Sequence, residues 1–176
     1  NENKAVAYDE NSLNEAFEKA TPDADGKKMI SIELTQVPNT QLFRNEFPAS
    51  VFTSENGDRL IKLTSDVGTI VLPCNMLAGT ELESKDNITI SISKAEKANL
   101  SQEMQNIIGD RPIIDLNISQ GNQKLTWYNP SSPVTVSVPY TPTPEELANP
   151  EHIVVWYINE EGNAVAVPNG RYNTDT

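Results

Sequence analysis

The sequence predicts an all-β fold, mainly an antiparallel β-sandwich, with two or three short helices. Apolar and polar residues alternate over many short segments, as in strands that have one buried face. Turn residues separate these segments. A length of 176 residues with 37% hydrophobic residues is enough to bury a core, in one large domain or two small ones.

The alternation places the strands in order along the chain. Apolar residues take every second position in segments 30–34, 88–92, 114–118 and 134–140. Tight turns with positive φ are expected at the glycines of Asn56-Gly57-Asp58, Gln120-Gly121-Asn122 and Glu161-Gly162-Asn163. Four further segments read as strands: RLIKL, GTIVLP, KLTWY and AVAVP.

One segment differs from the others because it is apolar on both faces. Residues Ile153 to Ile158, IVVWYI, predict a central strand that protein covers on both sides. Trp156 is then expected in the core. The preceding TPTPEELANP is interpreted as a crossover between sheets, because Pro150 ends its short helix and leads into this strand.

Three short helices are expected from their start signals. Ser12 and Glu15 form a predicted capping box, followed by an apolar face that includes Leu13 and Phe17. The other two starts are Ser101, for a helix that Gly109 closes, and Thr143-Pro144 with Glu146.

A boundary near Asn99 divides the chain into two predicted halves. Residues 1–98 form an N-terminal β-sandwich half, and residues 99–176 form a C-terminal β-rich half. No linker rich in glycine, serine or proline separates them, so the halves are expected to associate closely.

Charge and composition exclude several partner classes. The net charge of −12 makes nonspecific binding to nucleic acid or anionic lipid unfavourable, so neither is predicted as a partner. The longest apolar run has six residues, far fewer than the roughly 20 of a membrane helix, so membrane insertion is not expected. Cys74 is the only cysteine, and its apolar context predicts a buried, inert thiol.

No catalytic or metal-binding set emerges from the residues. His152 is the only histidine and is interpreted as a strand-edge residue. Asp23 to Lys28, DADGKK, resembles the start of a calcium loop, but its first carboxylate and its final bidentate glutamate would fall on Thr21 and Ile32. A polar turn is the preferred interpretation. The chain is therefore predicted to be no enzyme and to hold no cofactor or metal.

Aromatic residues give the remaining functional hypothesis. Trp127 lies on the same side of its predicted strand as Leu125 and should point inward, whereas Tyr128 lies on the side of Thr126 and should be exposed. Sugar-binding β-sandwiches stack sugar rings on exposed aromatic side chains. Tyr128 and Trp127 are therefore the candidate carbohydrate-binding residues.

Two stretches carry a resemblance to known families. Residues 68–77, GTIVLPCNML, resemble the strand and turn of ankyrin-type and netrin-receptor-type β-sandwiches, written Gly-x-φ-x-φ-Pro-x-x-x-Leu. Residues 107–173, from IIGDRP to NGRYN, are similar to a β-sandwich module of Gram-positive secreted and cell-surface proteins, often found next to S-layer homology repeats. The resemblance extends more weakly over residues 11–77.

The resemblance implies an incomplete C-terminal half. In that family a further strand follows, of the type Gly-x-Val-x-Phe-x-x-x-His-Phe-Ser, whereas this sequence ends at Asn173-Thr174-Asp175-Thr176. In related GAIN-type domains such a tripeptide is a self-cleavage site. The final strand is thus expected to be absent, through truncation, cleavage or supply by another segment.

These observations together predict a noncatalytic structural or interaction module. The resemblance implies an extracellular location on a bacterial cell surface, where the module spaces a functional head from a wall anchor and contacts neighbouring domains of the same protein. One alternative is a carbohydrate-binding module for cell-wall or plant polysaccharide. The other is a fragment of a self-cleaving surface domain.

Overall fold

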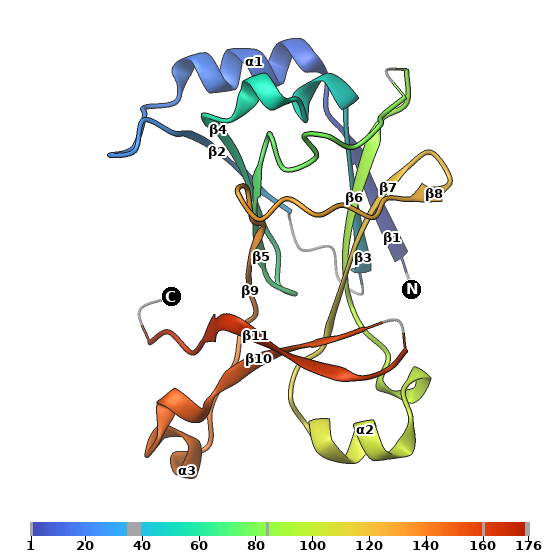
Figure 1. Ribbon diagram of the computed structural model, residues 1–176, viewed down its shortest axis with the longest axis vertical. Coiled ribbons are helices and arrows are strands. Elements are labelled where there is room, and N and C mark those ends of the chain that lie inside the picture. The colour runs from blue at the N-terminus through green and yellow to red at the C-terminus, as the bar shows by residue number, and fades with distance from the viewer. Residues whose placement is uncertain (1, 35–39, 84, 160, 175–176) are drawn as a thin grey trace. The chain divides into compact units, whose positions relative to one another are not determined.

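The computed structural model describes residues 2–34, 40–83, 85–159 and 161–174 (Figure 1). Contacts group the chain into two compact units, each made from two segments. Unit 1 comprises Asn1–Ala95 and Pro112–Pro139, and unit 2 comprises Glu96–Arg111 and Tyr140–Thr176. The expected halves, 1–98 and 99–176, stay a prediction about domain organisation.

Unit 1 contains a five-stranded sheet, here sheet A. Its strands follow the order β1-β3-β6-β7-β8, in which β1 pairs with β3 in parallel and the other pairs are antiparallel. The bounds are β1 Glu2–Ala7, β3 Thr40–Phe47, β6 Ile88–Lys94, β7 Ile114–Gln120 and β8 Gln123–Lys124.

A four-stranded sheet, sheet B, completes the strands of unit 1. Its order is β2-β4-β5-β9, again with one parallel pair, β2 with β4, and antiparallel pairs elsewhere. The bounds are β2 Lys28–Glu33, β4 Arg59–Thr64, β5 Thr69–Pro73 and β9 Thr135–Ser137. Both sheets are therefore mixed rather than purely antiparallel.

One apolar cluster joins the two sheets into a sandwich. Alternate residues of β3, β5 and β6 are buried in it, as the period of two predicts. Ile88, Ile90 and Ile92 of sheet A and Ile70 and Leu72 of sheet B are at most 1% exposed and belong to this cluster. Because burying such a side chain contributes about 1.5–3 kcal/mol, the shared cluster stabilises unit 1 as a whole.

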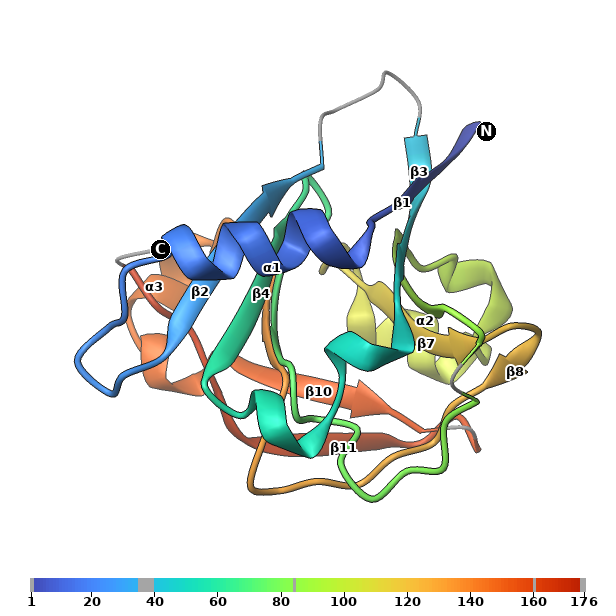
Figure 2. The same ribbon diagram turned by 90° about the horizontal axis from the view of Figure 1, so that it is seen from above.

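Helix α1, Glu10–Lys19, covers one end of the sandwich, across β2 and β4 (Figures 1 and 2). Leu13 and Phe17 are buried in the core, as expected. The predicted start at Ser12 is wrong by three residues. Asp9 is the N-cap, and its carboxylate accepts hydrogen bonds from the backbone N–H and the hydroxyl of Ser12.

Unit 2 consists of short elements. Helix α2 spans Gln102–Ile108, helix α3 spans Pro144–Leu147, and strands β10 (Val154–Ile158) and β11 (Ala164–Arg171) form an antiparallel hairpin. The predicted caps are confirmed, because Ser101 caps α2 and Thr143 forms a capping box with Glu146 at α3. Unit 2 also contains the 3-10 turns η3 Lys97–Asn99 and η4 Pro150–His152, whereas η1 Ala49–Val51 and η2 Ser54–Asn56 belong to unit 1.

The β-rich class with short helices is confirmed, but four local predictions are wrong. Lys124 is the only residue of KLTWY that lies in a strand. The segment 134–140 contains only the three-residue strand Thr135–Ser137, and all three residues are exposed. Gly57 has a φ of −65°, whereas Gly121 and Gly162 have the expected positive φ. The segment 153–158 is not a central strand, because among the described residues β10 pairs only with β11 and several of its side chains are exposed.

Candidate functional site

Tyr128 projects from the segment that crosses from sheet A to sheet B. Its side chain is 90% exposed, while Leu125 and Trp127 pack against the core cluster. The predicted orientations of Tyr128 and Trp127 are thus confirmed. The reason for these orientations differs from the expected one. The segment is a loop and not a strand, and Trp127 anchors the loop to the core.

Hydrogen bonds fix this segment on both sides of Tyr128. On one side, the backbone N–H of Leu125 donates to the carbonyl of Ile118 over 2.8 Å. On the other, the Asn129 amide donates to the carbonyl of Asn75 over 3.1 Å. Because the residues on both sides of Tyr128 are held, its backbone would lose little conformational freedom when the ring binds a ligand.

Two adjoining hollows lie at the end of the sandwich that α1 covers. The first, of about 330 Å³, is lined mainly by apolar residues of segments 49–54 and 77–82. The second, of about 240 Å³, is polar and includes Glu10, Glu55 and Arg59. Phe52 is the only aromatic residue that lines either hollow, and it is 1% exposed, so neither offers a ring on which a sugar could stack.

Arg59 stabilises this end of the sandwich, and its charged group is not free to bind a ligand. Its guanidinium donates to the Asn14 side-chain oxygen over 2.8 Å and lies 5.1 Å from the centre of the Phe17 ring. These contacts join the start of β4 to α1. The polar hollow therefore has its cation already engaged in holding the helix.

The thiol of Cys74 is buried, as predicted. Burial raises its pKa to about 12, an effect that the nearby Arg59 charge offsets only in part. Since the thiolate is the nucleophilic form, a thiol with this pKa stays neutral near pH 7.

His152 and the Asp23 turn take the structural roles that the sequence favoured. His152 lies exposed in turn η4, just before β10, with its ring 3.9 Å from the Glu151 carboxylate. Asp23 closes a polar turn by accepting hydrogen bonds from the backbone N–H groups of Asp25 and Lys27, each over 2.9 Å. Among the described residues, no group of three or more His, Cys, Asp or Glu could hold a metal ion.

In unit 2, Glu146 links three parts of the chain. One carboxylate oxygen accepts from the Arg111 guanidinium over 3.0 Å, and the other accepts from the Tyr140 hydroxyl over 2.6 Å. The Tyr140 bond is the main cause that lowers the pKa of Glu146, and it also raises the pKa of Tyr140. Arg111 further donates to carbonyls at the end of α2, so this network connects α2 to α3.

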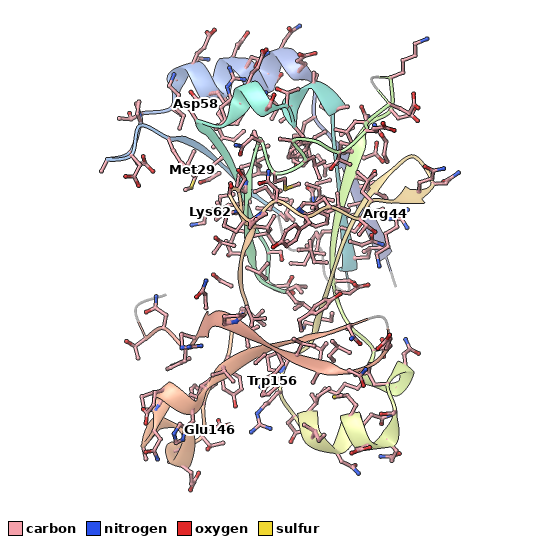
Figure 3. All side chains as sticks on the ribbon, in the orientation of Figure 1. Met29, Arg44, Asp58, Lys62, Glu146 and Trp156 are labelled. Atoms are coloured by element: carbon pink, nitrogen blue, oxygen red, sulfur yellow. The ribbon has the colours of Figure 1, made fainter. Side chains whose placement is uncertain are left out.

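The β10–β11 hairpin exposes aromatic and aliphatic side chains that the sequence placed in the core. Trp156 lies on this hairpin, where Figure 3 labels it. Its exposed fraction is 57%, and that of Tyr157 is 58%. The expectation of a buried Trp156 is therefore wrong. The apolar run was visible in the sequence, but a two-stranded sheet leaves such a run without the covering layers that a central strand would have.

No protein-family model, curated protein or solved structure matches this chain. The resemblance to Gram-positive surface modules thus remains a prediction from the residues. In the described part of the chain, no helix has the length and apolar character needed to cross a membrane.

Proposed function

We propose that the chain is a noncatalytic structural and interaction module of a bacterial cell-surface protein. In this proposal it lies outside the cell and spaces a functional head from a wall anchor. The supporting observation is the single core of unit 1, which joins two sheets and α1 through side chains such as Phe47 and Ile61 that are 0% exposed. A sandwich packed in this way holds its shape under small loads, because displacing one sheet breaks contacts throughout the core.

The spacing role can be tested in the parent protein. The chain is replaced by a glycine-serine linker of about 10 residues, and the surface exposure of the neighbouring head is measured with an antibody. Exposure should fall while the intrinsic activity of the head is unchanged, since the mean end-to-end distance of such a linker is only about 16–19 Å. Unchanged exposure would argue against a spacing role. Loss of an activity that the purified chain restores would contradict the noncatalytic assignment.

A carbohydrate-binding module is the second candidate function, and Tyr128 supports it. A fully exposed ring on a segment anchored by Trp127 and Asn129 is suited to stacking against a sugar. Trp127 would then position the segment rather than touch the sugar. The expected ligand is cell-wall or plant polysaccharide.

A pull-down on insoluble polysaccharides and isolated Gram-positive cell walls tests this second function. Retention that Tyr128→Ala abolishes and Tyr157→Ala preserves would support it, because Tyr157 is also an exposed tyrosine but belongs to unit 2. Equal retention of both variants would remove Tyr128 from the site. The absence of retention on every matrix would leave only the noncatalytic spacing and interaction role.

A further inference from the structure

The described residues of unit 2 form no buried core of their own. All of the buried side chains in the described part of the chain lie in unit 1, and none lies in segments 96–111 or 140–174. An isolated two-stranded hairpin is at most marginally stable in water, and the two helices that accompany it are short. Among its own described residues, unit 2 therefore has no second layer that would cover its apolar side chains.

Two of these side chains share one side of the β10–β11 hairpin. Tyr157 and Val165 are cross-strand partners, so both point to the same side. Val155 precedes Tyr157 by two residues and lies where the pairing register shifts. We name this set, Val155, Tyr157 and Val165, the hairpin face. Its members are 43%, 58% and 50% exposed, so the hairpin presents three exposed apolar side chains that include a tyrosine.

Strand β11 lies very close to Val155. A Cβ atom at Gly170 would lie 2.5 Å from the Val155 Cβ, so only glycine allows β11 to approach this closely. The pairing register shifts at the same place, since Val154 faces Arg171 and Trp156 faces Ala166.

The charge around the hairpin face is negative. Segments 96–111 and 140–176 contain nine Asp or Glu residues and only three basic ones, Lys97, Arg111 and Arg171. Arg111 is engaged with Glu146. Exposed carboxylates also lie near both ends of the hairpin, at Glu151 before β10 and at Glu161 in the turn. A second copy of the chain carries the same excess of negative charge, so like-charge repulsion opposes self-association.

We propose that the hairpin face is a docking surface for a protein partner that presents apolar side chains flanked by lysine or arginine. The apolar part covers Val155, Tyr157 and Val165, and the basic groups face the carboxylates of unit 2. Tyrosine is often the residue that dominates such interfaces, because it buries a large area with few rotatable bonds. Two valines beside the ring favour a protein surface over a sugar, whose hydroxyls they cannot satisfy.

A peptide selection tests this proposal, which deepens the interaction role proposed above. A displayed library of random linear peptides is selected on the full chain and counter-selected on the double variant Tyr157→Ser/Val165→Ser. Enriched peptides should combine apolar residues with Lys or Arg, bind the double variant at least about tenfold more weakly, and lose affinity as salt is added. Tyr128→Ser, which changes an exposed tyrosine of unit 1, should bind these peptides like the unmodified chain.

Several outcomes would overturn the proposal. They are peptides that bind the double variant equally well, peptides without basic residues or salt dependence, and no enrichment at all. Analytical sedimentation tests whether a second copy of the chain occupies the hairpin face instead. Self-association of the unmodified chain that is lost in the double variant would assign the hairpin face to a second copy and overturn the proposal. Unchanged amide chemical shifts of β10 and β11 away from the two substituted positions show that the hairpin of the double variant is still folded. The linker replacement described above tests the spacing role alone, and the peptide selection tests the docking surface alone. A failure of the spacing role can therefore be distinguished from a failure of the docking surface.

Discussion

The side chain of Gln120 connects the end of β7 to the loop that precedes β6, and replacing it should destabilise unit 1. It is 7% exposed. Its oxygen accepts from the Glu83 backbone N–H over 2.9 Å, and its nitrogen donates to the carbonyls of Glu83 and Asp86 over 2.7 and 3.0 Å. Gln120→Ala removes all three hydrogen bonds at once.

The expected loss of stability follows from the number and environment of these bonds. At a net contribution of about 0.5–1.5 kcal/mol each, three bonds give about 1.5–4.5 kcal/mol. Glu83 and Asp86 are exposed, so their backbone groups can regain hydrogen bonds to water in the variant. The lower part of the range applies for this reason, and we expect a loss of about 1.5–3 kcal/mol in the free energy of unfolding.

Urea unfolding measures this loss, and Gln123→Ala is the matched control. Gln123 is the cross-strand partner of Gln120 in the β7–β8 pair, but it is exposed. Its replacement should change the free energy of unfolding by less than about 0.5 kcal/mol. A Gln120→Ala loss as small as that of the control, with the same dependence on urea, would refute the view that this amide secures the loop.

Four further predictions concern other parts of the chain. Gly68→Ala should reduce the free energy of unfolding by about 1–3 kcal/mol and lower the melting temperature, because the added Cβ would lie 2.7 Å from the Ser137 carbonyl oxygen. An unchanged melting curve would contradict this. Cys74, with a thiol pKa raised to about 12, should resist Ellman's reagent until urea is added, and native-state labelling would disprove its burial. Tyr140→Phe should raise the NMR titration midpoint of Glu146, because it removes the hydrogen bond that lowers the pKa of this carboxyl group. The lowered pKa contributes stability that is present above the ordinary carboxyl pKa of about 4.3 and is lost as the pH falls through the lowered value. An unshifted midpoint would show that the Tyr140 hydrogen bond does not lower the Glu146 pKa. Amide hydrogens of β10 and β11 should exchange faster than those of β6, and equal protection would show that unit 2 is more stable than its exposure indicates.

Period-two alternation predicted strands well where one face is buried. Ile88, Ile90 and Ile92 alternate with polar residues and point into the core, so burial of single strands could be predicted from the sequence. The pattern reports how a strand is buried but not which strand lies beside it. The parallel pairing of β2 with β4 was therefore missed. Strands β1 and β3 were not predicted at all, so their parallel pair was missed as well, and the sheets are mixed.

Helix starts were predictable where the signal is local and has no competitor. Thr143 and Glu146 form the expected capping box within four residues. Ser12 failed because Asp9, three residues earlier, is a strong N-cap residue as well and takes hydrogen bonds from Ser12 itself. A capping motif identifies a helix reliably, but two cap residues in succession leave the first turn ambiguous.

The candidate site was predictable in part. The exposure of Tyr128 followed from its alternation with Trp127, although the segment turned out to be a loop held by Asn129. The exposure of Tyr157 could not be predicted in the same way. Its burial depends on how many layers surround β10, and this number is set by segments distant in the sequence.

The wrong prediction for residues 153–158 and the proposed docking surface have one physical cause. An apolar run such as Val154-Val155-Trp156-Tyr157 is stable in water only when other side chains cover it, and sequence alone does not say which chain supplies them. Unit 1 covers its own strands with a second sheet and a helix. The hairpin of unit 2 has no such layer among the described residues of that unit, so its apolar side chains remain available. Burial of the hairpin face by a basic partner would give this strand the covered environment that its sequence predicts.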